Sequence, residues 1–229
     1  MSIRRPSQIS IQLIVLYLAI FFIIWSLRAT IFYSIDQRIM SDLLQQLYSN
    51  TIRVLIWVIP VFVYLQIIDR VRPTRYLLLG APLDRRELWY SSAIVIVYLS
   101  VGIGLDYVLI GNQSGLSIVA SQPWYSLIFL LPIAPIAEEI LFRGFVLRKI
   151  QDFVFFWPAN LITSVLFTVI HWPHWLYTQM PGETIITSSL RIFVLSCLLG
   201  YLVKRTNSLW PSIVTHILNN LVSEIVRIG

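Results

Sequence analysis

Two adjacent carboxylates, Glu138 and Glu139, stand inside a long apolar run, and Arg143 follows four residues later. Residues four apart share one face of a helix, so Glu139 and Arg143 are placed to form an ion pair. Glu138 points about 100° away from that face, which leaves its carboxylate free. A free carboxylate in a pocket that holds little water is a candidate general base.

Two further polar motifs stand in later apolar runs. Phe167 and His171 are four residues apart in "LFTVIHWPHW", and His216 and Asn220 are four apart in "LWPSIVTHILNNL". His171 and His216 lie within a few residues of the midpoints of their runs, as Glu138 does, so all three can reach one pocket. The same residue types also join membrane helices by hydrogen bonds, so each motif on its own is also compatible with a structural role.

The composition indicates which elements position these residues. Hydrophobic residues make up 57% of the 229 and charged residues only 12%, against about 25% charged in a typical soluble domain. This is the profile of an integral membrane protein. The net charge of +6 does not indicate nucleic-acid binding, because most basic residues lie between the apolar runs. The single cysteine, Cys197, excludes a disulfide framework within the chain.

Seven apolar segments are each long enough to cross a hydrocarbon core of about 30 Å as a helix. They cover roughly residues 10–33, 52–69, 90–111, 122–148, 154–175, 185–203 and 208–227. We therefore expect an all-α, polytopic integral membrane bundle of about seven spans, with a catalytic pocket within the membrane. Residues 1–115 are expected to form N-terminal spans without motifs, and residues 116–229 the catalytic helical core.

The basic residues predict a multi-pass orientation. They form four clusters, at Arg4 and Arg5, at residues 70–86, at Arg148 and Lys149, and at Lys204 and Arg205. All four clusters fall on one side of the membrane if the seven spans alternate. Because basic loops stay in the cytoplasm, the N-terminus is expected inside and the C-terminus outside. The first apolar run is longer than the hydrophobic region of a usual signal peptide, and no clear small-x-small cleavage site follows it, so it is expected to be an uncleaved span.

The three motifs, in this order and in the fourth, fifth and seventh apolar spans, resemble the CPBP family of CAAX prenyl endopeptidases and bacteriocin-processing proteins, also called the Abi family. The resemblance covers about residues 122–227, and it includes "LFRGFVL" after the glutamates. It implies intramembrane endopeptidase activity on a peptide or membrane-protein substrate, lipidated in one branch of the family.

The resemblance also implies a role for each motif residue. Glu138 matches the glutamate that activates the attacking water, and His171 matches the residue that assists it. His216 and Asn220 match residues that orient the water or stabilise the oxyanion. The supporting residues are Glu139, Arg143 and Phe167.

The need for a metal stays open at this point. Two histidines and a carboxylate, here His171, His216 and Glu138, form a reasonable ligand set for one divalent ion such as zinc. The helical His-Glu-x-x-His motif of many zinc proteases is absent from the sequence. The resemblance equally permits a glutamate-dependent mechanism without a catalytic metal.

Two alternatives from other functional classes remain. A member of the same family acting as a non-proteolytic scaffold or immunity-type protein would bind in its pocket without cutting. A proton-coupled carrier would also place Glu and His inside the membrane, but we see no inverted repeat in the sequence.

Overall fold

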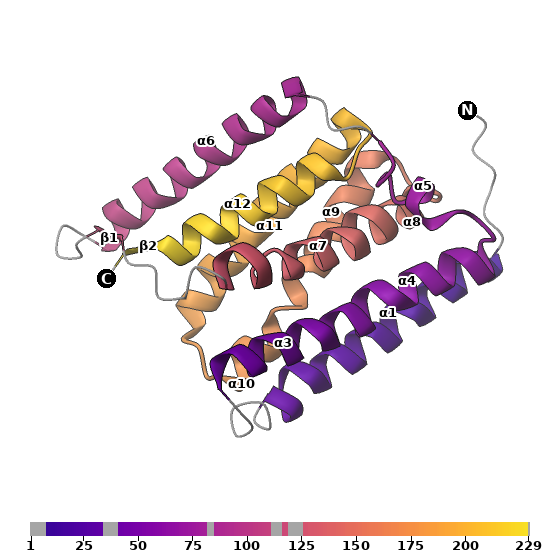
Figure 1. The fold of residues 1–229 in the computed structure, drawn as a ribbon, viewed down its shortest axis with the longest axis horizontal. Coiled ribbons are helices and arrows are strands. Elements are labelled where there is room, and N and C mark those ends of the chain that lie inside the picture. Colours follow the sequence, from indigo (N-terminus) through magenta and orange to yellow (C-terminus); the bar gives the residue numbers. More distant parts are fainter. Residues whose placement is uncertain (1–7, 34–40, 82–84, 111–115, 119–125, 229) are drawn as a thin grey trace.

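A computed structural model describes residues 8–33, 41–81, 85–110, 116–118 and 126–228 of the chain. Its described part is a helical bundle, as the composition predicts (Figure 1). The longer helices are α1 (Gln8–Ala29), α3 (Asp42–Arg53), α6 (Arg85–Ile110), α9 (Phe156–Val169), α11 (Gly182–Thr206) and α12 (Trp210–Ile225). Shorter α-helices are α4 (Ile59–Val63), α5 (Pro73–Tyr76), α7 (Ile133–Glu139), α8 (Leu147–Gln151) and α10 (Trp172–Tyr177). Four π-helical stretches are η1 (Val54–Val58), η2 (Tyr64–Ile68), η3 (Ser126–Leu130) and η4 (Ile140–Val146).

Each of the seven predicted apolar segments is helical over most of its described length. In that part of the chain, three helices are long and apolar enough to cross a membrane, namely Ile11–Tyr33, Leu43–Ile68 and Gly182–Thr206. Large apolar side chains such as Val15, Ile23 and Ile186 point outward and are 58–70% exposed, which suits contact with lipid. The all-α fold class and the integral membrane character are confirmed.

The second helical segment begins earlier than predicted. The sequence suggested a span over 52–69, whereas the helix starts at Asp42 and runs through α3, η1, α4 and η2 to Ile68. The added turns carry Gln45 and Ser49, which continue the face that bears Arg53. These polar side chains are accommodated because they line a cavity and not lipid.

Two helices are interrupted next to the motif residues. The fourth segment breaks at Leu131–Pro132, and α7 then starts at Ile133, consistent with the bend expected from its prolines. The fifth segment was predicted as one helix over 154–175, but α9 ends at Val169 and α10 starts at Trp172. His171 therefore lies at a helix break and not near the middle of a continuous helix. Trp25 of α1 holds this break by donating its Nε1 hydrogen to the Ile170 carbonyl at 3.2 Å.

The basic clusters that the structure describes gather at one end of the bundle. Lys149 lies 2.5 Å from Asp69, Arg205 lies 3.5 Å from Glu87, and the Arg148 guanidinium lies over the Tyr76 ring. These contacts join the ends of η2, α6, α8 and α11, near α5 at the right of Figure 1. Arg4 and Arg5 lie outside the described residues. Helix α10 and the start of α3 lie at the opposite end.

A three-residue antiparallel ladder, which the sequence analysis did not predict, pairs β1 (Leu116–Ile118) with β2 (Val226–Ile228). It joins the segment after α6 to the end of α12, which lies beside α6 in the bundle (Figure 1).

Candidate active site

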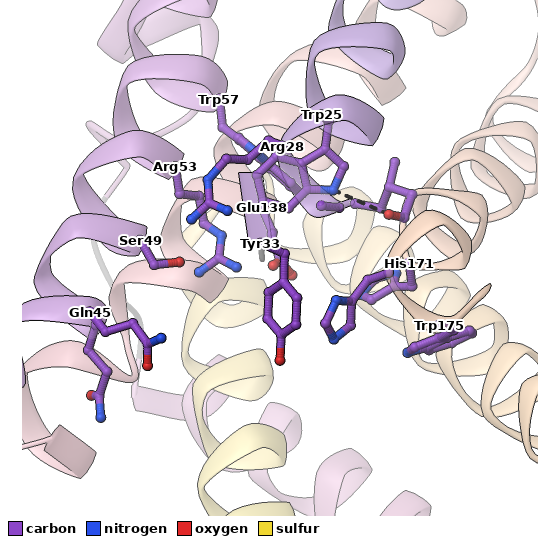
Figure 2. Close-up of a pocket in the computed structure, with 14 residues that line it drawn as sticks. Trp25, Arg28, Tyr33, Gln45, Ser49, Arg53, Trp57, Glu138, His171 and Trp175 are labelled. Carbon is purple, nitrogen blue, oxygen red and sulfur yellow. Dashed lines mark hydrogen bonds between the residues drawn. The ribbon is translucent and has the colours of Figure 1, made fainter. Parts of the chain in front are cut away.

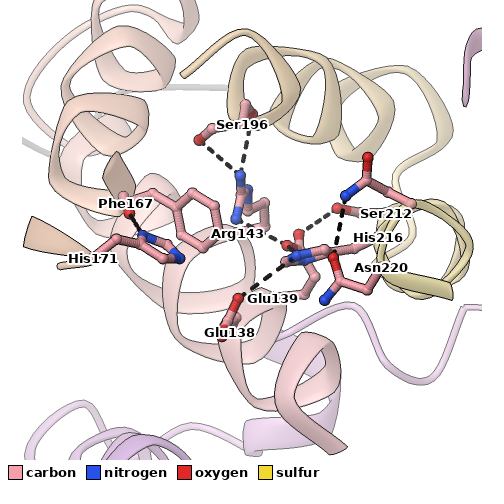
Figure 3. A network of polar contacts seen from close by, with 10 residues as sticks. Glu138, Glu139, Arg143, Phe167, His171, Ser196, Ser212, His216 and Asn220 are labelled. Carbon is pink, nitrogen blue, oxygen red and sulfur yellow. Dashed lines mark hydrogen bonds and ion pairs between the residues drawn. The ribbon is translucent and has the colours of Figure 1, made fainter. Parts of the chain in front are cut away.

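Glu139 is completely buried and held by groups from two helices. It stands at the end of α7 and receives the Nη1 hydrogen of Arg143 at 2.9 Å, so the predicted ion pair is present (Figure 3). From α12, the Ser212 hydroxyl donates to its Oε2, and Nδ1 of His216 lies 2.8 Å from its Oε1. Three donors therefore occupy this carboxylate, which fixes the rotation of α12 against α7.

Arg143 is held on its far side as well. Its Nη2 donates to the Ser196 hydroxyl at 2.7 Å and to the Ser196 carbonyl at 3.3 Å, which ties η4 to α11. Its guanidinium also lies over the Phe167 ring at 4.3 Å, so Phe167 packs against the charge. The predicted supporting residues Glu139, Arg143 and Phe167 thus form one buried cluster.

Glu138 has different surroundings although it is the next residue in the chain. Its carboxylate lines a cavity of about 350 Å³, whereas Glu139 points into the helix packing. His216 Nε2 lies 3.6 Å from Glu138 Oε2, which is too long for a direct hydrogen bond. Glu138 is only 8% exposed, so the cavity is its route to water or a ligand.

The cavity lies between the N-terminal helices and the break after α9 (Figure 2). Aromatic residues Trp25, Trp57 and Trp175 form apolar parts of its wall. The polar described residues that line it are Arg28, Tyr33, Gln45, Gln46, Ser49, Arg53, Glu138, His171 and His174. A cavity that combines aromatic walls with polar groups able to orient a molecule is suited to bind a ligand.

His171 shares this cavity with Glu138, and its hydrogen bond determines its tautomer. Its Nδ1 lies 2.9 Å from the Phe167 carbonyl, which can only accept. The hydrogen of a neutral ring therefore sits on Nδ1, and Nε2 keeps a lone pair that can accept from water. His171 and Glu138 are close enough for their charges to interact.

The structure divides the predicted catalytic residues into two groups. Glu138 and His171 line the cavity, whereas the described lining residues do not include His216 or Asn220. His216 lies behind Glu138 and bridges the two glutamates, while the Asn220 side-chain oxygen accepts from Asn219 Nδ2 at 3.1 Å.

The metal candidates do not form a ligand set in this arrangement. Among the residues that the structure describes, no group of three His, Cys, Asp or Glu side chains is placed to hold a metal ion. Nδ1 of His216 contacts Glu139, and its Nε2 lies 3.6 Å from Glu138 Oε2. The residues present thus do not fit a metal held by Glu138, His171 and His216, and no step below uses one.

Two basic residues in the cavity wall, Arg28 and Arg53, lie outside the three sequence motifs. Arg28 lies in the last turn of α1 and Arg53 ends α3, and both lie in the half of the chain where no motif was found. The sequence feature that could have identified them is that each is the sole basic residue within its apolar run. A charge inside a membrane segment is by default a candidate for function.

Comparison with known proteins agrees with the geometry. Residues 120–222 match the family described as "Type II CAAX prenyl endopeptidase Rce1-like". The chain is 25% identical over 152 residues to the Bacillus subtilis (strain 168) protein named "Putative membrane peptidase YdiL", and the match covers 62% of this chain. It spans 56%, little more than half, of that relative. No solved structure matches the chain. The matched segment carries all three motifs around the Glu139–Arg143 cluster, and both matches support membership of the CPBP family.

Proposed function

We propose that this chain is an intramembrane endopeptidase in which Glu138 activates the attacking water. The observation that carries the proposal is the contrast between two adjacent acids. Glu139 is occupied by Arg143, Ser212 and His216, whereas the Glu138 carboxylate lines the cavity beside His171. A base must reach its proton in a site that also admits the substrate, and Glu138 meets both conditions.

The proposed reaction uses water as the nucleophile. Glu138 takes a proton from a water molecule whose second hydrogen is donated to Nε2 of His171, and the water oxygen attacks the peptide carbonyl carbon. The tetrahedral intermediate then collapses, the C–N bond breaks, and the proton held by Glu138 passes to the leaving nitrogen. A substrate that fills the cavity would displace water from it and so strengthen each of these electrostatic contacts.

His216 and Asn220 act from α12 in this proposal. His216 is anchored on Glu139 and presents Nε2 toward Glu138, so it positions the Glu138 carboxylate across the 3.6 Å gap. Asn220 stands one turn further along the same helix, and we propose that its amide helps to stabilise the oxyanion when substrate is bound.

The proposed substrate is a peptide or membrane protein that reaches the cavity from the lipid phase, and a lipidated peptide is one such substrate. A cavity of about 350 Å³ is near the lower end for ligand sites, which range over about 300–1,000 Å³. It therefore suits a short extended segment near the cut bond.

Cleavage of N-palmitoylated peptides in lipid vesicles tests the proposal. Wild type is compared with Glu138→Gln and with Glu183→Gln, which removes an exposed acid at the start of α11. We expect cleavage by wild type and Glu183→Gln, with and without a chelator, and a loss of about 10²–10⁴-fold for Glu138→Gln.

Full activity of folded Glu138→Gln would refute the proposal. Inactivity of wild type, together with an unchanged cellular function of Glu138→Gln, would favour the non-proteolytic scaffold. Activity abolished by the chelator and restored by zinc would replace the metal-independent mechanism.

A further inference from the structure

Arg53 is a cation that the proposed reaction does not use. It ends α3, lines the same cavity as Glu138, and has a buried Nε atom with no hydrogen-bond partner among the described residues. Its Nη1 donates weakly to the Asn50 side-chain oxygen at 3.4 Å, and its guanidinium lies 5.6 Å from the Trp25 ring centre. Asn50 in turn donates to the Leu130 carbonyl at 3.2 Å, which fixes the side chain that Arg53 contacts.

Arg28 brings a second guanidinium to the same side of the cavity. It lies in the last turn of α1, is 8% exposed, and lies over the Tyr48 ring at 5.7 Å. Arg28, Arg53 and Glu138 line the same cavity, so the two arginines repel each other and the carboxylate attracts both. Figure 2 shows both guanidinium groups beside Glu138, with His171 across the cavity.

The cavity wall places two positive charges close together, and like charges repel each other more strongly where little water separates them. Within the described part of the chain, Arg53 has no carboxylate within 4 Å, so the repulsion from Arg28 is not offset by a direct ion pair at Arg53. Glu138 interacts with Arg53 only at longer range, and it loses its own charge when it accepts a proton from water.

We propose that Arg53, with Arg28 beside it, binds a carboxylate of the peptide substrate and thereby selects which peptides are cut. This inference rests on the proposed function, because a peptide carries its negative charge on its C-terminal carboxylate or on Asp and Glu side chains. The planar guanidinium forms paired hydrogen bonds with a carboxylate, which a neutral amide cannot accept as strongly. Binding the anion would also offset the repulsion between the two arginines.

The two arginines lie on the N-terminal helices, so these helices would bind the substrate carboxylate. Both residues lie outside the matched segment 120–222, whereas Glu138 and His171 lie inside it. The N-terminal half would thus supply selectivity to a reaction centre built by the C-terminal half. Ser49 and Gln45, about one and two turns before Arg53 on the same helix face, extend the polar wall toward the end of the bundle opposite the basic clusters.

Four matched N-palmitoylated apolar hexapeptides in lipid vesicles test the inference and locate the carboxylate. The first ends in a free carboxylate and the second in an amide. The third is an amide with Glu among its last three residues, and the fourth has Gln at that position. Cleavage is measured for wild type, Arg53→Gln, Arg53→Lys, Arg28→Gln and, as the matched control at the other end of the bundle, Arg75→Gln.

We expect wild type and Arg75→Gln to prefer one carboxylate-bearing peptide over its neutral partner. Arg53→Gln should raise the KM for that peptide about 10- to 100-fold with little change in kcat, and leave cleavage of the neutral partner unchanged. Arg28→Gln should weaken the preference, and Arg53→Lys should retain part of it because the charge remains. The neutral partner also controls for folding, since a misfolded variant would cleave neither peptide.

A binding measurement separates this inference from the proposed function. The Kd of an N-acetylated apolar tripeptide, as acid and as amide, is measured by calorimetry on Glu138→Gln, with and without Arg53→Gln. Tighter binding of the acid that disappears with Arg53→Gln supports the inference even if no peptide is cleaved. Equal Kd values for acid and amide, together with equal cleavage of charged and neutral peptides, overturn it and leave the proposed peptidase intact.

Discussion

Nδ1 of His216 lies 2.8 Å from Oε1 of Glu139, so the imidazole of α12 is fixed by the acid that does not line the cavity. The same carboxylate holds Arg143, and the three residues are buried together. His216 then turns its other nitrogen toward Glu138. The chain thus uses one acid to position the groups around the other.

Glu139→Gln should therefore damage stability more than Glu138→Gln. The change leaves the buried Arg143 without a counter-charge, and breaking a buried pair in this way costs about 3–5 kcal/mol. Glu138→Gln should change the free energy of unfolding by no more than about 1 kcal/mol, because Glu138 lies 3.6 Å from His216 Nε2 and forms no direct hydrogen bond with it. Unfolding in mixed detergent micelles measures both. Similar values for the two variants would contradict the division of roles.

His171→Ala should remove activity and leave the fold intact. The His171 ring is hydrogen-bonded to the carbonyl of Phe167, which lies in the same segment. Removing the ring therefore breaks a hydrogen bond within one segment and not one between two helices. Cleavage of the palmitoylated peptides should fall about 10²–10⁴-fold. His174→Ala, which alters the same cavity wall from α10, is the control and should retain most of the activity. Equal losses in both variants would argue against a specific role for His171.

Gly200→Ala should destabilise the packing of α9 against α11. A methyl group at Gly200 would lie 1.9 Å from the side-chain oxygen of Asn160, whose Nδ2 donates to the Cys197 carbonyl at 3.0 Å. Forcing these groups apart should cost about 1–3 kcal/mol of unfolding free energy. Gly182→Ala is the matched control, because a methyl group there meets nothing within 4 Å. A Gly200→Ala protein as stable as this control would show that the close approach is absent.

Cysteine labelling can test the membrane orientation that the basic clusters predict. In a Cys197→Ser background, Gly80→Cys reports on the end that carries the clusters and Gly182→Cys on the opposite end, and both sites have room for a side chain. If the basic end is cytoplasmic, an impermeant maleimide added to intact cells should label only Gly182→Cys. Labelling of Gly80→Cys alone would reverse the orientation and place the cavity end inside.

Contacts within one helix were predictable from the sequence. Glu139 and Arg143 are four residues apart, and helix geometry alone brings them to one face, as the structure shows. The long apolar runs likewise predicted helical segments, because a backbone in lipid must satisfy its own hydrogen bonds. The free orientation of Glu138 relative to Glu139 follows from the same 100° step.

Relations between helices depended on the tertiary structure. The sequence could not show that His216 would bind Glu139, that the fifth segment would break at His171, or that Arg28 and Arg53 would complete the wall beside Glu138. Residue spacing sets which side chains share a face, but it leaves the depth and rotation of each helix open. Those are decided by packing between helices, such as the close fit of Gly200 on Asn160, and by buried polar contacts that only one arrangement satisfies.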